Sequence, residues 1–232
     1  MATLYIIGTP IGNLGDISFR AVEILKSAVL VVCEDTRRTL KLLSHLVIRV
    51  KLLSCRSQNE ETAAGKVIAA LDQGQTAAYV SDAGTPALSD PGAVLAAMAV
   101  EAGHDVIPIP GPSAFAALLS IAGGRDKTVV FEGFLSPKAG RRRARLRELM
   151  AMDAAIVLYE SPFRVLKLLE DIAEIDNMRY ICIGREMTKI HEEYIRGTAE
   201  EILLNLSKRN EQKGEFAVYV SSGSPKSKSF RG

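Results

Sequence analysis

Three loops rich in glycine and proline could bind a small ligand through their main chain. They are GTPIGNLGD at 8–16, SDAGTPALSDPG at 81–92 and PIPGPSA at 108–114, and each follows a short apolar run. Glycine allows the backbone to approach a ligand, and the start of a following helix favours anions. The glycine spacing at 8–16 matches neither the dinucleotide fingerprint nor a Walker loop. The structural alternatives are a tight turn for the first loop, a rigid capped loop for the second and an interdomain linker for the third.

Within the second and third loops, individual side chains suggest what the ligand is. Asp82 can accept hydrogen bonds from ribose hydroxyls or a ligand ammonium, and Gly84 permits close backbone approach. Long Gly/Pro loops in compact domains are usually functional. Small residues from Ser113 and Ala114 onward leave room for a flat ligand such as adenine.

Two adjacent acids, Glu34 and Asp35, end an apolar run and begin the motif EDTR at 34–37. Carboxylates at a strand end can orient a substrate or act as a general base. They can equally cap the helix expected to begin near Thr36.

Three further motifs in the second half also follow apolar runs: FEGF at 131–134, YESPFR at 159–164 and GREMTKIHEE at 184–193. Their cations could contact phosphates, and their acids could pair with those cations. The cations are Arg164, Arg185 and Lys189, and the acids are Glu132, Glu160 and Glu186. An internal ion-pair network is the alternative interpretation.

A basic run covers 138–147, with six cations in ten positions and no acid: Lys138, Arg141, Arg142, Arg143, Arg145 and Arg147. On a helix, Arg141, Arg142 and Arg145 share a face, where like charges repel. Binding to a phosphate backbone would relieve that repulsion. A solvated helix face is the alternative, and the few aromatic residues nearby do not suggest base stacking.

Composition limits the class of protein. The 232 residues carry a net charge of +2, which divides into −2 over residues 1–112 and +4 over 113–232. Three cysteines and three isolated histidines form neither a disulfide framework nor a zinc spacing. The longest apolar run, 93–100, is far shorter than the ~20 residues that span a bilayer. We therefore expect a cytoplasmic protein with no metal site and no membrane association.

The elements that must position these residues alternate along the chain, which predicts α/β architecture with mainly parallel sheets. Strands are expected at 3–8, 29–33, 50–54, 76–81, 106–109, 128–134, 155–159, 180–184, 193–197 and 216–221. Helices are expected at 60–72, 91–102, 138–152, 162–175 and 199–208. Capping boxes at Ser57/Glu60 and Thr198/Glu201, and the N-cap pair Asp90–Pro91, support three of them. We expect two α/β domains, 1–112 and 113–222, and a flexible tail over 223–232.

Seven motifs in order resemble those of the small-subunit ribosomal RNA methyltransferase I family, within the S-adenosylmethionine-dependent tetrapyrrole methylases. They are TPIGN (9–13), EDTR (34–37), SDAGTPALSDPG (81–92), PGPSA (110–114), FEGF (131–134), YESPFR (159–164) and REMTK–HEE (185–193). The resemblance covers residues 3–222. It implies two α/β domains with S-adenosyl-L-methionine in the cleft between them, and a homodimer. It also implies 2′-O-methylation of a cytidine in small-subunit (16S) ribosomal RNA.

Carried over by position, the resemblance implies cofactor contacts at Pro10, Asp82, Gly84, Thr85, Leu88, Ser113, Ala114, Leu158, Tyr159, Met187 and Glu215. Members often have His at the position of Phe163 and His-rich residues at 56–58, so those histidines are not required if this chain is active. Many members also continue into a small C-terminal helical extension, whose absence here would affect RNA affinity more than cofactor binding.

Methyl transfer to a ribose hydroxyl benefits from a general base. The candidates are Glu34, Asp35, Glu60 and, if burial lowers its pKa, Lys189. Candidates for contacts with RNA are Arg37, Arg141, Arg142, Arg145 and Arg164, with Lys189 as a further phosphate ligand. A tetrapyrrole (corrin precursor) methyltransferase and a non-catalytic RNA-binding or ribosome-assembly protein are the alternatives. The basic run argues for RNA, and the intact 81–92 loop argues for a working cofactor site.

Overall fold

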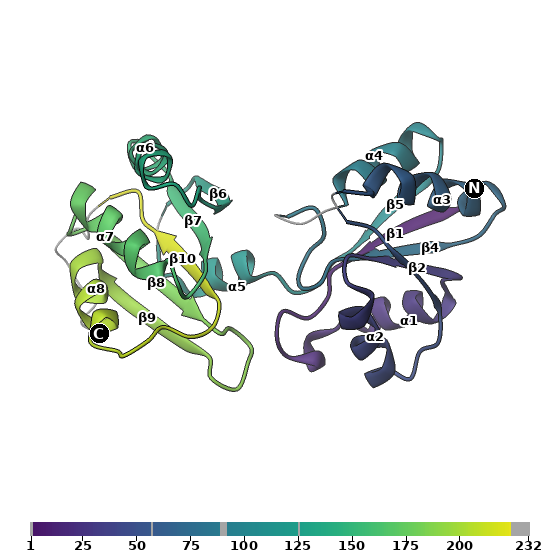
Figure 1. Ribbon diagram of the computed structural model, residues 1–232, viewed down its shortest axis with the longest axis horizontal. Coiled ribbons are helices and arrows are strands. Elements are labelled where there is room, and N and C mark those ends of the chain that lie inside the picture. Colours follow the sequence, from purple (N-terminus) through teal and green to yellow (C-terminus); the bar gives the residue numbers. More distant parts are fainter. Residues whose placement is uncertain (1, 57, 89–91, 125, 224–232) are drawn as a thin grey trace. The chain divides into compact units, whose positions relative to one another are not determined.

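The computed structural model describes residues 2–56, 58–88, 92–124 and 126–223 (Figure 1). The chain divides into two compact units, Met1–Ser113 and Ala114–Gly232. The boundary expected after Pro112 lies one residue before this division. Each unit has its own five-stranded sheet and its own core, so each is considered by itself.

The first unit contains an entirely parallel sheet with the strand order β3-β2-β4-β1-β5. Its strands are β1 (Thr3–Ile7), β2 (Leu30–Cys33), β3 (Lys51–Ser54), β4 (Ala77–Val80) and β5 (Asp105–Ile109). Because the strands are parallel, all their carboxyl ends lie at one edge, which is where open α/β sheets bind ligands.

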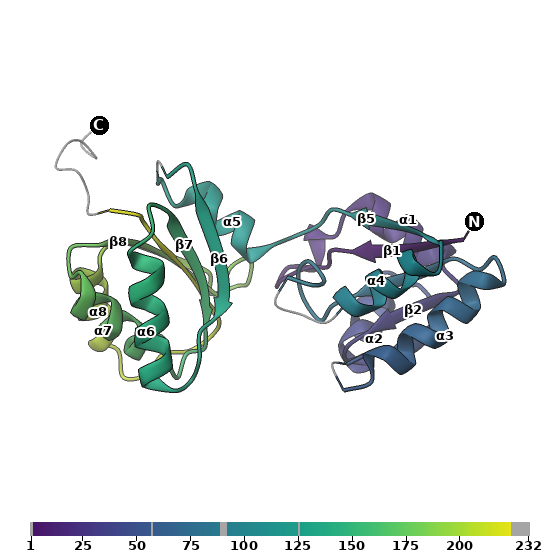
Figure 2. The same cartoon turned by 90° about the horizontal axis from the view of Figure 1, so that it is seen from above.

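Helices cover both faces of this sheet (Figures 1 and 2). They are α1 (Phe19–Ser27), α2 (Thr36–His45), α3 (Glu60–Asp72) and α4 (Ala93–Glu101), with a short 3-10 turn, η1 (Leu14–Asp16). Alternate strand residues point to opposite faces. Leu4 and Tyr79 therefore pack with α3 and α4, whereas Ile7 and Val80 pack with α1 and α2.

The second unit contains a mixed sheet with the order β6-β7-β10-β8-β9. Its strands are β6 (Val129–Phe134), β7 (Ala155–Glu160), β8 (Tyr180–Arg185), β9 (Glu193–Thr198) and β10 (Phe216–Val220). β6 and β7 are parallel, but β10 is antiparallel to both its neighbours, and β8 is antiparallel to β9. The expectation of mainly parallel sheets is therefore correct for the first unit and wrong for the second. Residues 186–192 are too few for a crossover, which needs a dozen residues or more, so β8 and β9 must be antiparallel.

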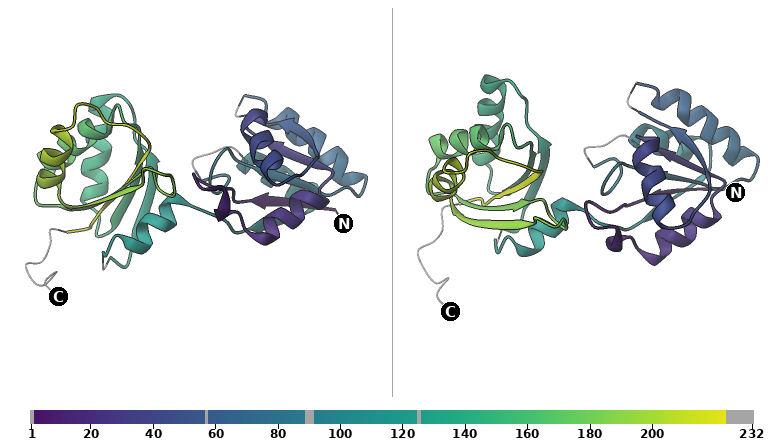
Figure 3. Two further views of the ribbon diagram at one scale, coloured as in Figure 1. Left: turned by 90° about the horizontal axis from the view of Figure 1, so that it is seen from below. Right: turned by 60° about the horizontal axis from the view of Figure 1, so that its bottom comes forward.

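Four helices flank this second sheet: α5 (Ala114–Ile121), α6 (Ala139–Met150), α7 (Val165–Ile175) and α8 (Ala199–Ser207). α6, α7 and α8 contribute to the core on one face of the sheet, with Leu146, Leu169 and Ile202 among its buried residues. α5 lies on the other face, where Leu118 is fully buried (Figures 1 and 3).

The ten expected strands are all confirmed to within two residues at each end. The capping box at Thr198 and Glu201 is confirmed, with both of its hydrogen bonds present. Asn59, and not Ser57, occupies the N-cap position of α3, and the Asn59 side chain makes no capping hydrogen bond. Ser57, Asp90, Pro91 and the tail from residue 224 lie outside the described residues. Within the described chain, no helix is long and apolar enough to cross a membrane.

Candidate active site

The loops after β1, β4 and β5 are joined through main-chain hydrogen bonds. The Thr9 N–H donates to the Gly84 carbonyl at 2.9 Å, and the Gly84 N–H donates to the Thr9 carbonyl at 3.0 Å. The Gly8 N–H donates to the Ile109 carbonyl at 3.1 Å. The structure therefore brings the three candidate ligand-binding loops together, and we call residues 8–12, 81–88 and 110–112 the loop platform.

Glycine is needed in the loop platform because its backbones are in contact. A Cβ on Gly8 would lie 2.8 Å from the Gly111 Cα, which is closer than real Cβ atoms come. Gly84 has a positive φ of 80°, where a side chain would be strained. These glycines thus let the loops after β1 and β5 pack against each other at the ligand-binding edge of the sheet.

Asp82 extends the loop platform toward β2. Its Oδ1 accepts a hydrogen bond from the Asp35 N–H at 2.9 Å, and its Oδ2 lies 3.5 Å from the Arg38 Nε. The half-buried carboxylate is thereby fixed in place and keeps acceptor capacity for a ligand hydroxyl or ammonium.

The other expected cofactor contacts of the first unit lie in or next to the platform. Pro10 and Leu88 are half-buried, and the exposed Thr85 donates its hydroxyl to the Pro112 carbonyl at 3.4 Å. Ser113 ends the first unit, and Ala114 is the first residue of α5. Both are half-buried.

In the second unit, Leu158 and Tyr159 point to opposite faces of β7. The Leu158 side chain is fully buried in the core with α6, α7 and α8, so a cofactor contact from that side chain is excluded. The Tyr159 hydroxyl accepts a hydrogen bond from the Phe115 N–H at 2.9 Å, and its ring packs edge-on against Phe131. Met187 is also buried, against Gly184.

Lys189 is held between two carboxylates. Its Nζ lies 2.7 Å from a Glu186 oxygen and 2.9 Å from a Glu215 oxygen. Burial alone would lower the pKa of Lys189, but the hydrogen bonds to both carboxylates outweigh burial and leave the pKa raised. The condition under which Lys189 was expected to act as a base, a pKa lowered by burial, is therefore not met. Glu215, the last expected cofactor contact, has a largely exposed carboxylate.

Two of the candidate bases are committed to helix ends. Asp35 caps α2 by accepting from the Arg37 N–H at 2.9 Å, and its carboxylate also receives two bonds from the Arg37 guanidinium. These hydrogen bonds hold the pKa of Asp35 well below its usual range. Glu60 accepts from the N–H groups of Gly92, Val94 and Leu95 at 2.9, 3.1 and 3.4 Å, and so caps α4.

Glu34 is the remaining candidate base. Its half-buried carboxylate makes no hydrogen bond or ion pair with any described residue, although its carbonyl accepts from Ser54 and Arg56. Burial raises the pKa of Glu34, and repulsion by Asp82 adds to this, against the opposing effect of Arg38 and Arg56. A raised pKa and a free carboxylate are the properties that a general base needs.

The basic run on α6 is largely neutralised by acids from other elements. Arg142 and Asp171 form a buried pair at 2.6 Å, with side chains only 5% and 2% exposed. Arg142 is therefore excluded as an RNA contact. Arg145 binds both oxygens of Glu132 at 2.8 Å and also pairs with Glu148. Arg141 alone of the three expected RNA contacts on α6 is exposed and has no partner in the described chain.

Arg164 and Arg37 are the two expected RNA contacts outside α6. The Arg164 guanidinium lies 2.7 Å from the buried Glu160 carboxylate and is only 25% exposed. Arg37 is 84% exposed, although it pairs with Asp35. Arg164 and Lys189 thus make the internal ion pairs that were the alternative to phosphate contacts.

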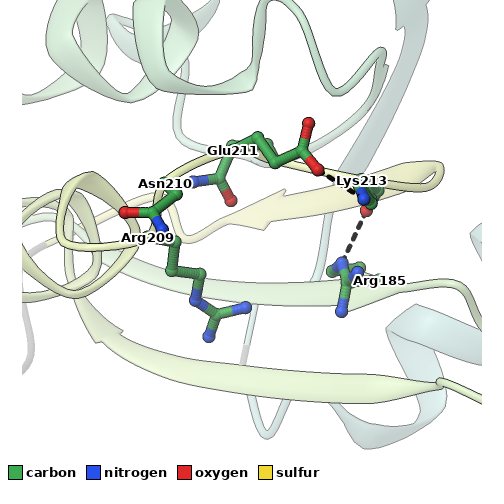
Figure 4. A pocket seen from close by; sticks show the side chains of 6 residues that line it. Arg185, Arg209, Asn210, Glu211 and Lys213 are labelled. Carbon is green, nitrogen blue, oxygen red and sulfur yellow. Dashed lines mark hydrogen bonds and ion pairs between the residues drawn. The ribbon is translucent and has the colours of Figure 1, made fainter.

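Sequence reasoning missed a hollow in the second unit next to the end of β8 (Figure 4). It has a volume of about 280 Å³ and is lined by Arg185, Arg209, Asn210, Glu211, Gln212 and Lys213. Arg185 and Arg209 both pair with Glu193, and Arg185 also donates to the Lys213 carbonyl at 2.6 Å. The only signal in the sequence is a set of polar residues after α8, which resembles an ordinary loop.

Neither thiol nor metal chemistry is supported by the described residues. Cys33, Cys55 and Cys182 are buried, and burial raises the pKa of each thiol, that of Cys55 to about 11. In the described ranges, no group of three or more His, Cys, Asp or Glu residues could hold a metal ion.

The sequence and the fold correspond to a known class of enzyme. A sequence model described as Tetrapyrrole (Corrin/Porphyrin) Methylases matches residues 3–203. The chain therefore belongs to the tetrapyrrole methylase family, which is a family of methyltransferases.

Within this family, the chain is similar to proteins named Ribosomal RNA small subunit methyltransferase I. The protein from Borrelia garinii subsp. bavariensis is 47% identical over 95% of this chain and 99% of its own length. The protein from Thermotoga maritima is 41% identical over 95% and 99%. The longer protein from Halalkalibacterium halodurans is 44% identical over 94% of this chain and 75% of its own length. The resemblance inferred from the seven motifs is thus confirmed.

Solved structures share the fold at much lower identity. Uroporphyrin-III-C-methyltransferase from Thermus thermophilus has a TM-score of 0.65 and 16% identity, over 96% of this chain and 95% of that one. A cobalt precorrin-4 methyltransferase has a TM-score of 0.65 and 17% identity, over 94% of each chain.

Proposed function

We propose that this protein transfers a methyl group from S-adenosyl-L-methionine to the 2′-hydroxyl of a cytidine in small-subunit (16S) ribosomal RNA. The names of relatives at 41–47% identity over most of the chain support the RNA substrate. One structural observation carries the hydroxyl chemistry. It is the free Glu34 carboxylate with a raised pKa, in the segment that adjoins the loop platform.

The loop platform lies at the carboxyl ends of the parallel strands, where open α/β sheets bind ligands, and it offers Asp82 to the cofactor. Asp82 would accept hydrogen bonds from the ammonium or ribose hydroxyls of the cofactor. The resemblance assigns the adenine contacts to Tyr159 and to the backbone near Met187. When bound, S-adenosylmethionine supplies a sulfonium methyl, which the ribose oxygen accepts while the electron pair of the C–S bond stays on sulfur.

The protein's own contribution is to position the ribose and to take its proton. Glu34 receives the proton of the 2′-hydroxyl as the oxygen–carbon bond forms. Burial and repulsion by Asp82 raise the pKa of Glu34. A raised pKa lies closer to neutral pH, where it suits proton transfer better. Asp35, which is bound to Arg37, orients α2 and leaves Glu34 free.

We further propose that the protein forms a homodimer, as the resemblance implies, and that it works in the cytoplasm, as its composition suggests. Relatives with ribosomal RNA in their names are far closer in sequence than the tetrapyrrole methyltransferases of known structure. The RNA substrate is therefore preferred to a corrin precursor. A non-catalytic RNA-binding protein would have no use for the free carboxylate beside the platform.

The test is methyl transfer from labelled cofactor to small ribosomal subunits, with mapping of the modified ribose. The wild-type protein should label one cytidine, and Glu34→Gln should lower the rate by ~10²–10⁴-fold. Glu61→Gln, a matched change at an exposed first-turn residue of α3, should keep full activity.

Calorimetry with S-adenosylmethionine separates the possible failures. Glu34→Gln should bind the cofactor as the wild type does, because Glu34 is not assigned to the cofactor. No methyl transfer by the wild type would overturn the function. Full activity of Glu34→Gln would overturn only the assignment of the base.

A further inference from the structure

The outer face of α2 carries three cations and no acid. Arg37, Arg38 and Lys41 are all exposed, and residues 36–45 contain neither Asp nor Glu. Arg37 and Lys41 are four residues apart, so they are neighbours on the helix surface. We call Arg37, Arg38 and Lys41 the α2 basic face.

Internal ion pairs compensate little of this charge. The Arg38 side chain is 65% exposed and reaches Asp82 only at 3.5 Å. Lys41 has no hydrogen bond or ion pair with any described residue. Arg37 pairs with Asp35 but remains 84% exposed, so its outer donors stay in solvent.

The position of these cations on the helix is unfavourable for stability. Arg37 and Arg38 lie in the first turn of α2, where the helix dipole is positive and favours acids. Exposed ion pairs contribute little to folding, so the α2 basic face has no clear stabilising role. An anionic partner outside the chain would remove this unfavourable charge.

The α2 basic face adjoins the candidate active site within the first unit. α2 begins two residues after Glu34, and its cap Asp35 donates its N–H to Asp82 of the loop platform. A polyanion on this face would therefore lie next to the candidate base and the platform.

We propose that the α2 basic face binds phosphates of the RNA strand that carries the target ribose. This inference rests on the proposed function, because it places the substrate of that same site. RNA fits the face better than an acidic protein does, since a phosphate backbone offers regularly spaced charges to cations along a helix. Contacts of this kind position the substrate without reading its sequence.

The experiment compares two double variants with equal loss of charge from the first unit. Arg38→Gln/Lys41→Gln removes two cations of the α2 basic face. Lys26→Gln/Lys66→Gln removes two exposed cations from α1 and α3. The affinity for purified small-subunit ribosomal RNA is measured at several salt concentrations. Thermal unfolding and S-adenosylmethionine calorimetry are recorded for each variant.

The α2 variant should lose about tenfold in RNA affinity at moderate salt, and its salt slope should fall by about 1.4–1.8 for two lost phosphate contacts. The matched variant should keep the wild-type slope. Because Arg38 lies near Asp82, the single change Lys41→Gln, which touches neither the platform nor Asp82, should give about half of the slope change.

An unchanged slope in both α2 variants would overturn this proposal, as would an equal fall in the matched variant. Either result would leave the proposed function standing, provided that the wild type still methylates small subunits. A slope that is unchanged for RNA, together with weaker binding to an acidic protein, would assign the face to a protein partner and overturn the RNA assignment. Absence of methyl transfer by a wild type that binds RNA through this face would instead count against the function alone.

Discussion

Helices α2 and α6 are both rich in arginine, and both lack acidic residues in their first turn, yet their cations have different surroundings. On α6, Arg142, Arg143 and Arg145 each pair with an acid of α7 or β6. On α2, the acids that pair with the cations among the described residues are Asp35 and, at 3.5 Å, Asp82. The denser basic run therefore joins elements of the second unit, and the sparser one faces solvent. Charge density in the sequence does not measure free charge on the surface, because partners arrive from other elements.

The largest effect on the free energy of unfolding is expected at Arg142, the buried cation of α6. Arg142→Ala should lower the free energy of unfolding by about 1–3 kcal/mol, because one oxygen of the buried Asp171 carboxylate would lose its partner while the other keeps the half-exposed Arg143. Urea unfolding measures the change. The double variant Arg142→Met/Asp171→Leu should recover most of the loss. A loss below 1 kcal/mol for Arg142→Ala would show that this α6 cation is not structural.

A smaller effect is expected where α6 meets β6. Glu132→Gln should lower the free energy of unfolding by about 1 kcal/mol, the upper end for a partly exposed pair, since both Glu132 oxygens bind Arg145. RNA affinity should not change, because Arg145 keeps its ion pair with Glu148. An increase in RNA affinity would show that Arg145, once released, can act as the α2 cations do.

The third effect is a pH dependence of the stability of the fold, caused by Glu34, which precedes α2. Because the folded state raises the pKa of Glu34, its carboxyl stabilises the fold below the ordinary glutamate pKa of about 4.3, and this contribution is lost as pH rises through the raised pKa. Glu34→Gln should therefore be more stable than the wild type at pH 7.5, and this difference should disappear near pH 4. Urea unfolding at both pH values measures it. Equal stability at pH 7.5 would contradict the raised pKa.

The smallest effect is expected at the two unpaired cations. Lys41→Ala on α2 and Arg141→Ala on α6 should each change the free energy of unfolding by less than about 0.5 kcal/mol, because both side chains are exposed and have no partner in the described structure. A larger loss for Lys41→Ala would give α2 a structural role that its contacts do not show.

Most of the fold could be predicted from the sequence. The apolar runs are short and bounded by glycine, proline or caps, so local patterns were sufficient for all ten strands. Local patterns did not predict the direction of the strands in the second unit, because β10 comes from the far end of the chain and lies between β7 and β8. Nothing local to Phe216–Val220 indicates that neighbour.

The sequence predicted which loops form the candidate site, but it did not predict the role of each acidic residue in it. The glycine spacing indicated the loop platform, whereas the choice among Glu34, Asp35 and Glu60 depended on partners far along the chain. Glu60, for example, caps a helix that begins more than thirty residues later. The same limit applies to the α6 arginines, whose partner Asp171 lies on another helix.

The hydrogen bonds between Thr9 and Gly84 have a consequence for how this enzyme can diverge. Both are made by main-chain atoms alone, so their geometry does not depend on which side chains the neighbouring positions carry. Substitutions of side chains beside these two bonds can therefore alter what the surface recognises while both hydrogen bonds are kept. The architecture separates positions that must stay glycine from positions whose side chains can change, so recognition can change without rebuilding the loops.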